Sequence, residues 1–329
     1  MTATTTTRLG LLLVSVLLGC GGSGGSPQTP MVYYSVASLG LFRASLDGTG
    51  DVVALSPPLD ADRWLQDFIV SPEAGRVVYL ADQDADDVYE LYASNLDGTG
   101  NVKLNAPLVA GGNASLGFTI TPDGSRVLYW ADQDTDGVFE LYASNLDGTG
   151  NVKLNAPLLA GGEVSSGFVI TPDGRRVVYR ADQDTDEVRE LYASNLDGTG
   201  NVKLSAPLVA GGSVGGIASS GFAISPDGSR VLYWADQDTD DVFELYASNL
   251  DGTGNEKVNS PLVAGGEVSP SFVVSPDGSW VVYRADQDID EVLELYVSNL
   301  DETGNVKVNA PLEADRAVFE FVVHSESRR

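Results

Sequence analysis

Short apolar runs, rich in β-branched and aromatic residues, alternate with turn residues along the chain from Met31 onwards. In one stretch these runs occupy residues 118–121, 126–131, 138–146 and 152–155. Short runs bounded by Gly, Pro and Asp are typical of β-strands, whereas no stretch keeps the 3.6-residue period of an amphipathic helix. The pattern therefore predicts an all-β protein built from units of four short strands.

A repeated segment, Leu-Asp-Gly-Thr-Gly, shows the length of the unit. It begins at Leu46, Leu96, Leu146, Leu196 and Leu250, and an altered copy begins at Leu300. The copies are spaced by 50 residues, except for one spacing of 54 that reflects an insertion at 213–216. Four strands in about 50 residues correspond to one blade of a β-propeller.

The two ends of the repeat region complement each other. The first unit begins at Met31 and lacks a first strand, whereas residues 321–325 align with the first-strand segment 272–276 of the last full unit. A C-terminal strand that completed the first unit would remove two open sheet edges. We therefore predict that residues 31–329 form a six-bladed β-propeller of four-stranded blades, with the ring closed by the C-terminal strand.

The repeat also resembles that of a known family. Residues 225–233 read Ser-Pro-Asp-Gly-Ser-Arg-Val-Leu-Tyr, and residues 244–254 read Glu-Leu-Tyr-Ala-Ser-Asn-Leu-Asp-Gly-Thr-Gly. These motifs are similar to the WD-like repeat of the TolB β-propeller family, and five units carry them. The resemblance implies a protein-binding platform in the bacterial envelope, or a propeller of the kind found beside a hydrolase. The sequence shows neither a hydrolase domain nor the separate N-terminal α/β domain of TolB, so TolB's partners are not implied.

The N-terminus has the features of a secretion signal. Its apolar run, residues 9–18, is too short to span a bilayer core of about 30 Å and is typical of a secretory signal peptide. The Leu-Leu-Gly-Cys segment that ends at Cys20 resembles the bacterial lipoprotein box, in which the cysteine is lipidated. We predict a signal peptide at 1–20 and a flexible tether at 21–30; the alternative is an ordinary secretory signal with an incidental cysteine. The resemblance implies a lipid-anchored protein of the bacterial cell envelope, and Gly21 after the cysteine favours the outer membrane.

The composition narrows the classes of partner. The chain has 47 acidic residues against 19 basic ones, a net charge of −28. It should therefore repel nucleic acid and anionic lipid head groups, so that membrane attachment would rest on the lipid anchor. A hydrophobic content of 43% is enough for a sizeable core. The single cysteine excludes a disulfide framework, and the single histidine leaves few combinations for catalysis.

An acidic motif, Ala-Asp-Gln-Asp-x-Asp, occurs five times, just before the third strand of a unit. Its carboxylates at alternate positions match the first, third and fifth ligand positions of an EF-hand loop, and Glu140 stands at the ninth position of its unit. Hard cations such as Ca²⁺ prefer these oxygen ligands. The candidate Ca²⁺ ligands are Asp82, Asp84, Asp86, Asp132, Asp134, Asp136, Glu140, Asp182, Asp184, Asp186, Asp236, Asp238, Asp240, Asp286, Asp288 and Asp290.

The motif departs from the EF-hand in two ways. Only Gly137 supplies the glycine of position six, and Ala143 replaces the bidentate glutamate of position twelve in that unit. The alternative to a calcium site is a solvated hairpin turn, because Asp is a common turn residue. Two carboxylates 5 Å apart repel by roughly 0.8 kcal/mol in water, which favours a counter-ion. We therefore predict weak Ca²⁺ sites completed by water, on loops that share one face of the propeller.

The position before each acidic motif alternates between aromatic and basic residues. Trp130, Arg180, Trp234 and Arg284 stand there, and Phe139 and Phe243 are the expected cross-strand neighbours of the two tryptophans. Aromatic residues and arginine near an exposed face are typical binding anchors. The alternative is that these side chains pack one blade against the next.

Catalytic motifs are weak in this sequence. Two Gly-x-Ser-x-Gly matches, at 21–25 and 211–215, lie in Gly-rich segments rather than between a strand and a helix, and His324 stands in the predicted closing strand. We therefore predict a non-enzymatic, lipid-anchored propeller that acts as a binding or scaffold platform for an unidentified envelope protein or polymer. The alternatives are a propeller hydrolase or lyase acting on carbohydrate or peptide, and a mainly structural or adhesive protein.

Overall fold

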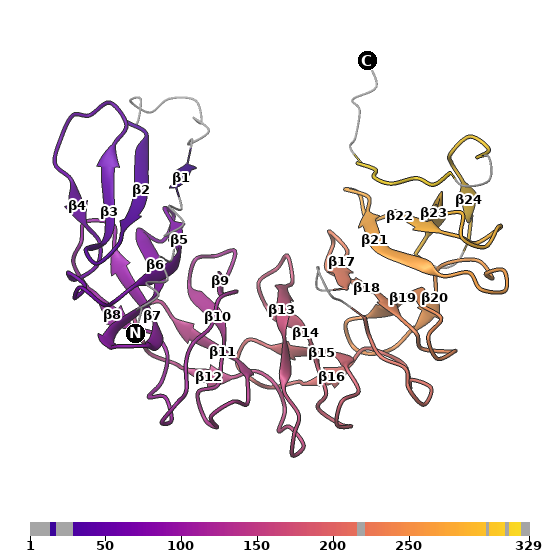
Figure 1. Cartoon of the computed structure of the whole chain (residues 1–329), viewed down its shortest axis with the longest axis horizontal. Coiled ribbons are helices and arrows are strands. Elements are labelled where there is room, and N and C mark those ends of the chain that lie inside the picture. The colour runs from indigo at the N-terminus through magenta and orange to yellow at the C-terminus, as the bar shows by residue number, and fades with distance from the viewer. Residues whose placement is uncertain (1–13, 18–28, 216–220, 301–302, 313–315, 324–329) are drawn as a thin grey trace, which may run out of the picture. The chain divides into compact units, whose positions relative to one another are not determined.

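The computed structural model describes residues 14–17, 29–215, 221–300, 303–312 and 316–323. Within these residues every helix or strand element is a strand, and the strands form six four-stranded antiparallel sheets (Figure 1). The all-β class and the six four-stranded blades of a β-propeller are therefore confirmed. No helix in the described part of the chain has the length and apolar character needed to cross a membrane.

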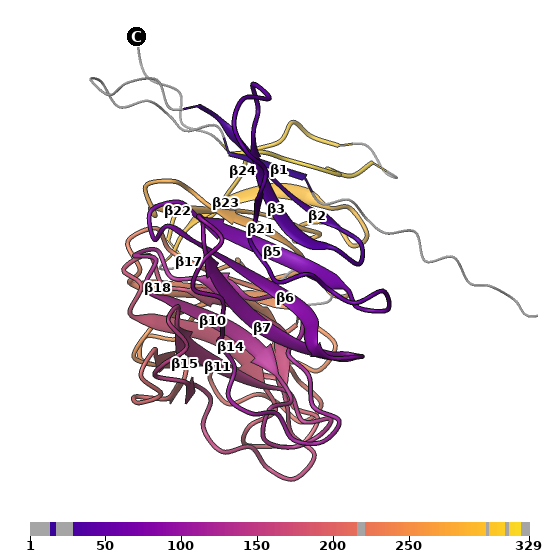
Figure 2. The same ribbon diagram turned by 90° about the vertical axis from the view of Figure 1, so that its left-hand side faces the viewer.

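The first compact unit is Met1–Val152 and holds three sheets; the strands of the second sheet run obliquely across the view in Figure 2. The first sheet contains β1 (Val14–Leu17), β2 (Met31–Val36), β3 (Gly40–Ser45) and β4 (Val53–Ala54). The second contains β5 (Leu65–Ser71), β6 (Arg76–Ala85), β7 (Val88–Asn95) and β8 (Val102–Lys103). The third contains β9 (Thr119–Ile120), β10 (Arg126–Ala131), β11 (Glu140–Asn145) and β12 (Val152–Lys153).

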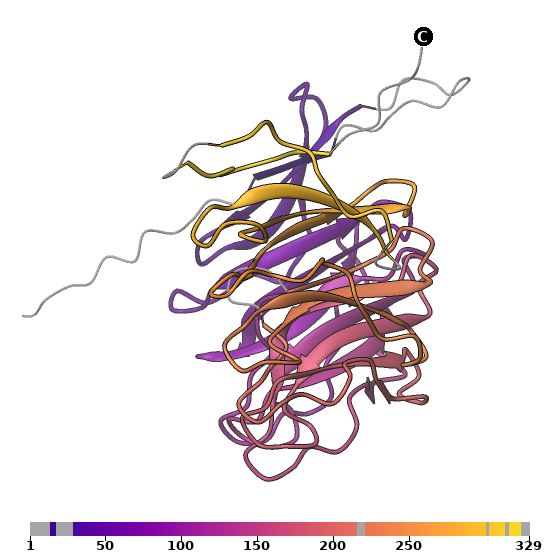
Figure 3. The same cartoon turned by 90° about the vertical axis from the view of Figure 1, so that its right-hand side faces the viewer.

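The second unit, Lys153–Arg329, holds the other three sheets (Figure 3). The fourth sheet contains β13 (Val164–Ile170), β14 (Arg176–Ala181), β15 (Glu190–Asn195) and β16 (Val202–Lys203). The fifth contains β17 (Phe222–Ile224), β18 (Arg230–Ala235), β19 (Glu244–Asn249) and β20 (Glu256–Lys257). The sixth contains β21 (Val268–Val274), β22 (Trp280–Ala285), β23 (Glu294–Asn299) and β24 (Val306–Lys307).

The two central strands of a blade carry its core. Val127, Leu128 and Tyr129 of β10 are all fully buried, and because successive strand residues point to opposite faces, both faces of this strand are covered. Tyr129 stacks on Tyr142 of β11 with the ring centroids 5.6 Å apart. Equivalent tyrosine pairs occur in the second, fourth, fifth and sixth sheets. The repeated Tyr of the sequence motif is therefore a core residue.

Neighbouring blades of one unit pack face to face through these strands. In the first unit, one cluster joins Val78 and Leu91 of the second sheet to Val127 and Tyr142 of the third. In the second unit, equivalent clusters join the fourth sheet to the fifth and the fifth to the sixth. The central strands of the second to fifth sheets therefore bury residues on both faces.

Within the predicted signal peptide, the structure describes one element only. Val14–Leu17, inside the predicted signal peptide, forms β1 and pairs antiparallel with β2 at the sheet edge predicted for the closing strand. Residues 321–323 lie outside any strand, so the structure does not show the closure, which stays a prediction. Cys20, His324 and residues 21–28 of the tether lie outside the described residues, and the lipoprotein prediction is equally untested.

Candidate functional site

The first aspartate of each acidic motif is buried and organises its hairpin. The Oδ1 atom of Asp132 accepts a 2.5 Å hydrogen bond from the backbone N–H of Asn113, and its Oδ2 accepts one of 3.0 Å from Gly137. Asp182, Asp236 and Asp286 bind the equivalent two N–H groups in their own blades. This carboxylate therefore ties the hairpin to the loop that enters the blade.

The hairpin of the second sheet differs at this point. Asp82 accepts a hydrogen bond of 2.5 Å from the N–H of Trp64, but its Oδ2 has no partner among the described residues. In this sheet the strands continue beyond Ala81, and Ala85 pairs with Val88 after a bulge. The longer ladder removes the N–H that the other blades place at the second oxygen.

The second aspartate of the motif shares a lysine with the glutamate of the next strand. Lys203 Nζ lies 2.7 Å from Asp184 and 2.7 Å from Glu190, and the Tyr192 hydroxyl donates to Glu190 at 2.9 Å. The same arrangement recurs as Lys103 with Asp84 and Glu90, Lys257 with Asp238 and Glu244, and Lys307 with Asp288 and Glu294. In the third sheet the Tyr142 hydroxyl donates to Glu140 at 3.1 Å.

These ion pairs change the acidity of their members. The hydrogen bond from Lys103 holds the pKa of Asp84 below its ordinary value. Burial lowers the pKa of Lys103, but its bonds to Asp84 and Glu90 outweigh burial and raise it overall. Burial, together with the negative charge of Glu90, raises the pKa of Tyr92. All three groups are therefore held in the states that pair with each other at neutral pH.

The predicted calcium ligands are thus not brought together as a set. The first aspartate binds backbone N–H groups, and the second aspartate and the glutamate surround a lysine that supplies the positive charge expected from a counter-ion. The sequence does carry this lysine, as the repeated Val-Lys or Glu-Lys of β8, β12, β16, β20 and β24. The sequence alone does not indicate the ion pair, because the lysine stands 13 residues from the glutamate and reaches it only across the strand pair.

The glutamine inside the motif is also structural. Tyr233 donates to Gln237 Oε1 at 2.6 Å, and Gln237 Nε2 donates to Asn255 at 3.2 Å. The backbone N–H of Ala206 donates to the same glutamine oxygen at 3.2 Å. Burial raises the pKa of Tyr233 to about 12. This network ties the segment after the fourth strand of one blade to the hairpin of the next, and the sequence pattern alone did not indicate it.

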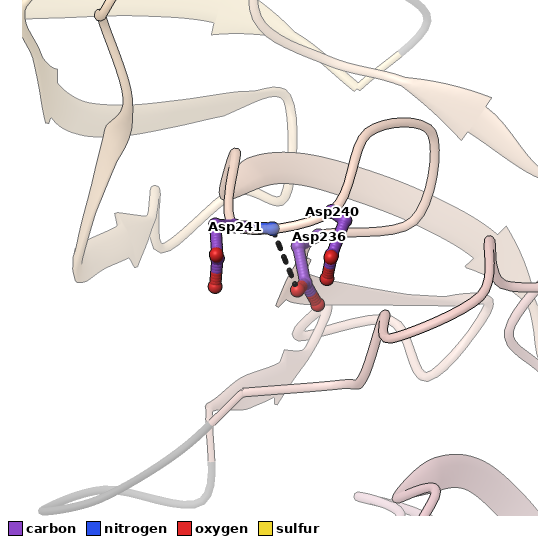
Figure 4. A group of neighbouring side chains, drawn as sticks. All are labelled: Asp236, Asp240 and Asp241. Atoms are coloured by element: carbon purple, nitrogen blue, oxygen red, sulfur yellow. Dashed lines mark hydrogen bonds between the residues drawn. The ribbon is translucent and has the colours of Figure 1, made fainter.

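The third aspartate of the motif and the residue after it lie at the hairpin tip. In the fifth sheet, carboxylate oxygens of Asp236, Asp240 and Asp241 all lie within 4.8 Å of one another (Figure 4). Asp240 and Asp241 are exposed, whereas Asp236 is buried and accepts the N–H of Asp241 at 3.3 Å. Among the described residues this is the group whose carboxylates come closest to the predicted calcium site, and the calcium prediction stays a prediction.

A glycine of the entering loop makes room for the third aspartate. Gly211 has φ of +93°, and a Cβ atom there would lie 2.4 Å from Asp240 Oδ1. Gly111, Gly161 and Gly265 approach Asp136, Asp186 and Asp290 in the same way. Within each of these blades, the acidic hairpin and the entering loop therefore lie at the same end of the sheet.

The four residues predicted as binding anchors contact neighbouring groups of the fold. Trp234 stacks on Phe243 at 3.9 Å between ring centroids, and its Nε1 donates to the carbonyl oxygen of Val268 at 2.5 Å. Trp130 stacks on Phe139 at 4.1 Å. The register corrects one expectation, because Leu141, not Phe139, lies directly opposite Trp130, and the phenylalanine is the diagonal neighbour.

The arginines at this position make the same kind of contact as Trp234. Arg180 donates to the carbonyl oxygen of Val214 at 3.1 Å, and Arg284 donates to that of Val318 at 3.0 Å. Arg180 is 8% exposed, and burial lowers the pKa of its guanidinium, with a further contribution from Arg189. Arg180 thus joins the fourth sheet to the segment that precedes the fifth, and Arg284 joins the sixth sheet to the C-terminal segment, which is a packing role of the kind considered above.

Comparisons with known proteins bear on the fold. No protein-family model matches the chain, and no curated protein matches it. Among solved structures, the putative TolB from Agrobacterium tumefaciens is 17% identical over 78% of this chain and 83% of its own, with a TM-score of 0.42. TolB from Acinetobacter baumannii is 15% identical over 82% of this chain and 59% of its own, with a TM-score of 0.36.

Enzymes are also among the similar structures. An oligogalacturonate lyase in complex with manganese is 15% identical over 83% of this chain and 74% of its own, with a TM-score of 0.46. At these identities the similarities concern the fold alone. The similar structures include two TolB proteins, as the resemblance of the repeat predicted.

Proposed function

We propose that this chain is a non-enzymatic, lipid-anchored propeller of the bacterial envelope, which acts as a platform for a cationic partner. One observation carries the proposal. Each acidic hairpin buries its first aspartate and its glutamate, and where the ion pairs are described its half-exposed second aspartate binds a lysine, so the carboxylates at the tip are the exposed ones left to meet a partner. The exposed tip residues are Asp86 and Asp87, Asp136, Asp186 and Glu187, Asp240 and Asp241, and Asp290 and Glu291.

The backbone at the tips supports a role for these side chains. Glu187 and Glu291 both have φ of +62°, a conformation that glycine adopts without penalty and other residues rarely adopt. Gly137 takes this position in the third sheet with φ of +74°. A non-glycine residue in this region costs on the order of 1 kcal/mol. Glutamate at such a position is favoured over glycine only if its negative charge has a role, such as binding a cationic partner.

The charge of the tips is not balanced locally. Among the described residues, no ion pair involves the exposed tip carboxylates, whereas the half-exposed second aspartate and the buried glutamate both pair with a lysine in the cited blades. Repeated like charges on adjacent hairpins raise the local concentration of cations and attract a partner of opposite charge. A basic protein segment or a polycation therefore fits this surface better than an acidic polysaccharide.

Binding of hexalysine, with hexaglutamate as the opposite-charge control, tests the proposal. A triple variant, Glu187→Gln, Asp241→Asn and Glu291→Gln, removes three tip charges and keeps the backbone N–H groups that bind the buried aspartates. We expect it to weaken hexalysine binding at least about threefold at moderate ionic strength. The matched control neutralises three exposed carboxylates away from the hairpins, Asp51→Asn, Glu73→Gln and Glu256→Gln.

Equal weakening in both triple variants would show only a general charge effect and would contradict a tip-specific surface. Capture of partners from an envelope extract, by the full chain and by the two variants, then identifies what binds there. Turnover of a carbohydrate or peptide substrate by the full chain would favour the enzyme alternative. Detection of lipid on Cys20 tests the anchor separately.

A further inference from the structure

A cavity of about 350 Å³ lies in the second unit, between the first strands of the fifth and sixth sheets and the C-terminal segment. Four phenylalanines line it: Phe222 of β17, Phe272 of β21, and Phe319 and Phe321 of the C-terminal segment. Small-ligand pockets in proteins typically occupy about 300–1,000 Å³ and are mainly apolar, with a few polar groups. The size and the lining of this cavity fall within that class.

The C-terminal wall of the cavity is held by defined bonds. The N–H of Val318 donates to Leu293 at 2.9 Å, and Arg284 Nη1 donates to the carbonyl oxygen of Val318 at 3.0 Å. Val268 makes the equivalent two bonds where the sixth sheet begins, with Phe243 and Trp234. The segment is therefore positioned as the first strand of a blade is positioned.

Three polar residues line the cavity and decide which charge it favours. Arg284 donates to the carbonyl oxygens of Val318 and Phe319 and to Ser269 Oγ at 3.0 Å, and its Nε is buried. Its guanidinium is thus directed at the protein. Glu320 is exposed and, among the described residues, has no ion-pair partner, so its carboxylate is the charge that a ligand meets.

We propose that this cavity binds an organic ammonium ion with an apolar body. Aromatic faces attract cations, by about 0.5–1 kcal/mol at exposed sites, and four phenylalanine rings offer such faces together with apolar contact area. Glu320 adds a charge opposite to that of the ligand. An anion would be repelled by this carboxylate, and the Arg284 guanidinium is already hydrogen-bonded to the protein. A sugar would find few hydrogen-bonding groups, since Ser271 and Glu320 are the polar side chains left to it. The site involves other residues than the hairpin tips and stands independently of the proposed function.

Ligand-observed NMR titration of the full chain at 150 mM salt tests the proposal with four probes. We expect 2-phenylethylammonium to bind with a dissociation constant on the order of 1 mM, and 2-phenylethanol and phenylacetate to bind more weakly. Methylammonium reports the non-specific attraction of cations to an acidic protein. Equal or tighter binding of phenylacetate, or no binding of 2-phenylethylammonium, would overturn the proposal.

Variants locate the binding. Glu320→Gln and Phe319→Ala should each weaken 2-phenylethylammonium about fivefold, while methylammonium should not respond to Phe319→Ala. The matched control is Val322→Ala, because Val322 is 82% exposed in the same segment and does not line the cavity. An unchanged affinity in Glu320→Gln would refute the site. Glu320→Gln is a conservative change, so it tests the site even if Phe319→Ala perturbs the fold.

Discussion

The indole Nε1 of Trp234 donates a 2.5 Å hydrogen bond to the carbonyl oxygen of Val268, the residue that begins β21 in the next blade. Arg180 and Arg284 place their guanidinium groups on the equivalent carbonyl oxygens of Val214 and Val318. A single sequence position therefore provides the donor at each of these junctions. Residues as different as Trp and Arg can alternate there because both carry a long, flat side chain that ends in an N–H group.

Replacing Trp234 with Phe should destabilise the protein. The variant keeps an aromatic ring against Phe243 but removes the donor to the buried Val268 carbonyl, at a cost of about 1–3 kcal/mol. Urea unfolding followed by circular dichroism measures the change. The control is Trp280→Phe, because Trp280 is 41% exposed and its change should cost less than about 0.5 kcal/mol. Equal effects of the two variants would argue against the junction role.

Replacing Lys203 with Met should leave two carboxylates without their cation. The Glu190 side chain is only 6% exposed, so we expect a loss of about 2 kcal/mol or more in unfolding free energy. Arg175→Met is the control, because the Arg175 side chain is 84% exposed and its ion pair with Asp173 is long at 4.0 Å. Adding Glu190→Gln to Lys203→Met should recover part of the loss, and a further loss would contradict the pairing.

The shared lysines also predict how stability depends on pH. The pKa of Asp84 is lowered in the folded state, so its contribution is present above the ordinary pKa and is lost as pH falls through the folded value. The pKa of Lys103 is raised, so its contribution is present below the ordinary pKa and is lost as pH rises through the folded value. Melting temperatures should therefore fall below about pH 4 and above about pH 10.5. In Asp84→Asn the loss at acid pH should be smaller, and an unchanged acid limb would contradict this assignment.

Two glycines separate backbone strain from steric conflict. Gly75 has φ of +64° and open space around its missing side chain, so Gly75→Ala should cost about 1 kcal/mol through the backbone alone. Gly111 has φ of +92°, and a Cβ there would lie 2.7 Å from Asp136 Oδ1. Gly111→Ala should therefore cost more, by about 1 kcal/mol or more, in chemical denaturation. A smaller loss in Gly111→Ala than in Gly75→Ala would show that the loop and the hairpin are not in contact.

Calcium binding can be assigned to hairpin tips by calorimetry. If the acidic hairpins bind Ca²⁺ as the sequence predicts, Asp240→Asn with Asp241→Asn should abolish the heat from the fifth sheet, because these carboxylates are close together and unpaired. Asp238→Asn should retain that heat, since Asp238 is 2.9 Å from Lys257 and is already neutralised. No heat in the unmodified protein, with the same melting temperature in Ca²⁺ and in chelator, would contradict the calcium prediction.

The sequence by itself determined the blades. Its 50-residue period, the turns with Asp and Gly, and the alternation of β-branched and aromatic residues are local features, so they predicted six units of four strands. Residues 126–131 were predicted as a strand and are β10. The third strand was predicted from residue 138 but begins at Glu140, because Val138 closes the hairpin through its N–H to Thr135. The sequence also predicted that Trp130 and Phe139 are neighbours, since both residues belong to one hairpin.

Only the tertiary structure decided what the acidic residues do. Asp184, Glu190 and Lys203 come from three places in the sequence, and the pairing of β14 with β15 and of β15 with β16 brings them within 3 Å. The row of carboxylates in the sequence predicts a cation site, and for the second aspartate and the glutamate the chain itself supplies a cation, the lysine. The donors from Trp234 and Arg284 and the phenylalanine cavity likewise depend on the packing of one blade against the next segment. Local patterns specify strands and turns, whereas charge compensation depends on which strands become neighbours.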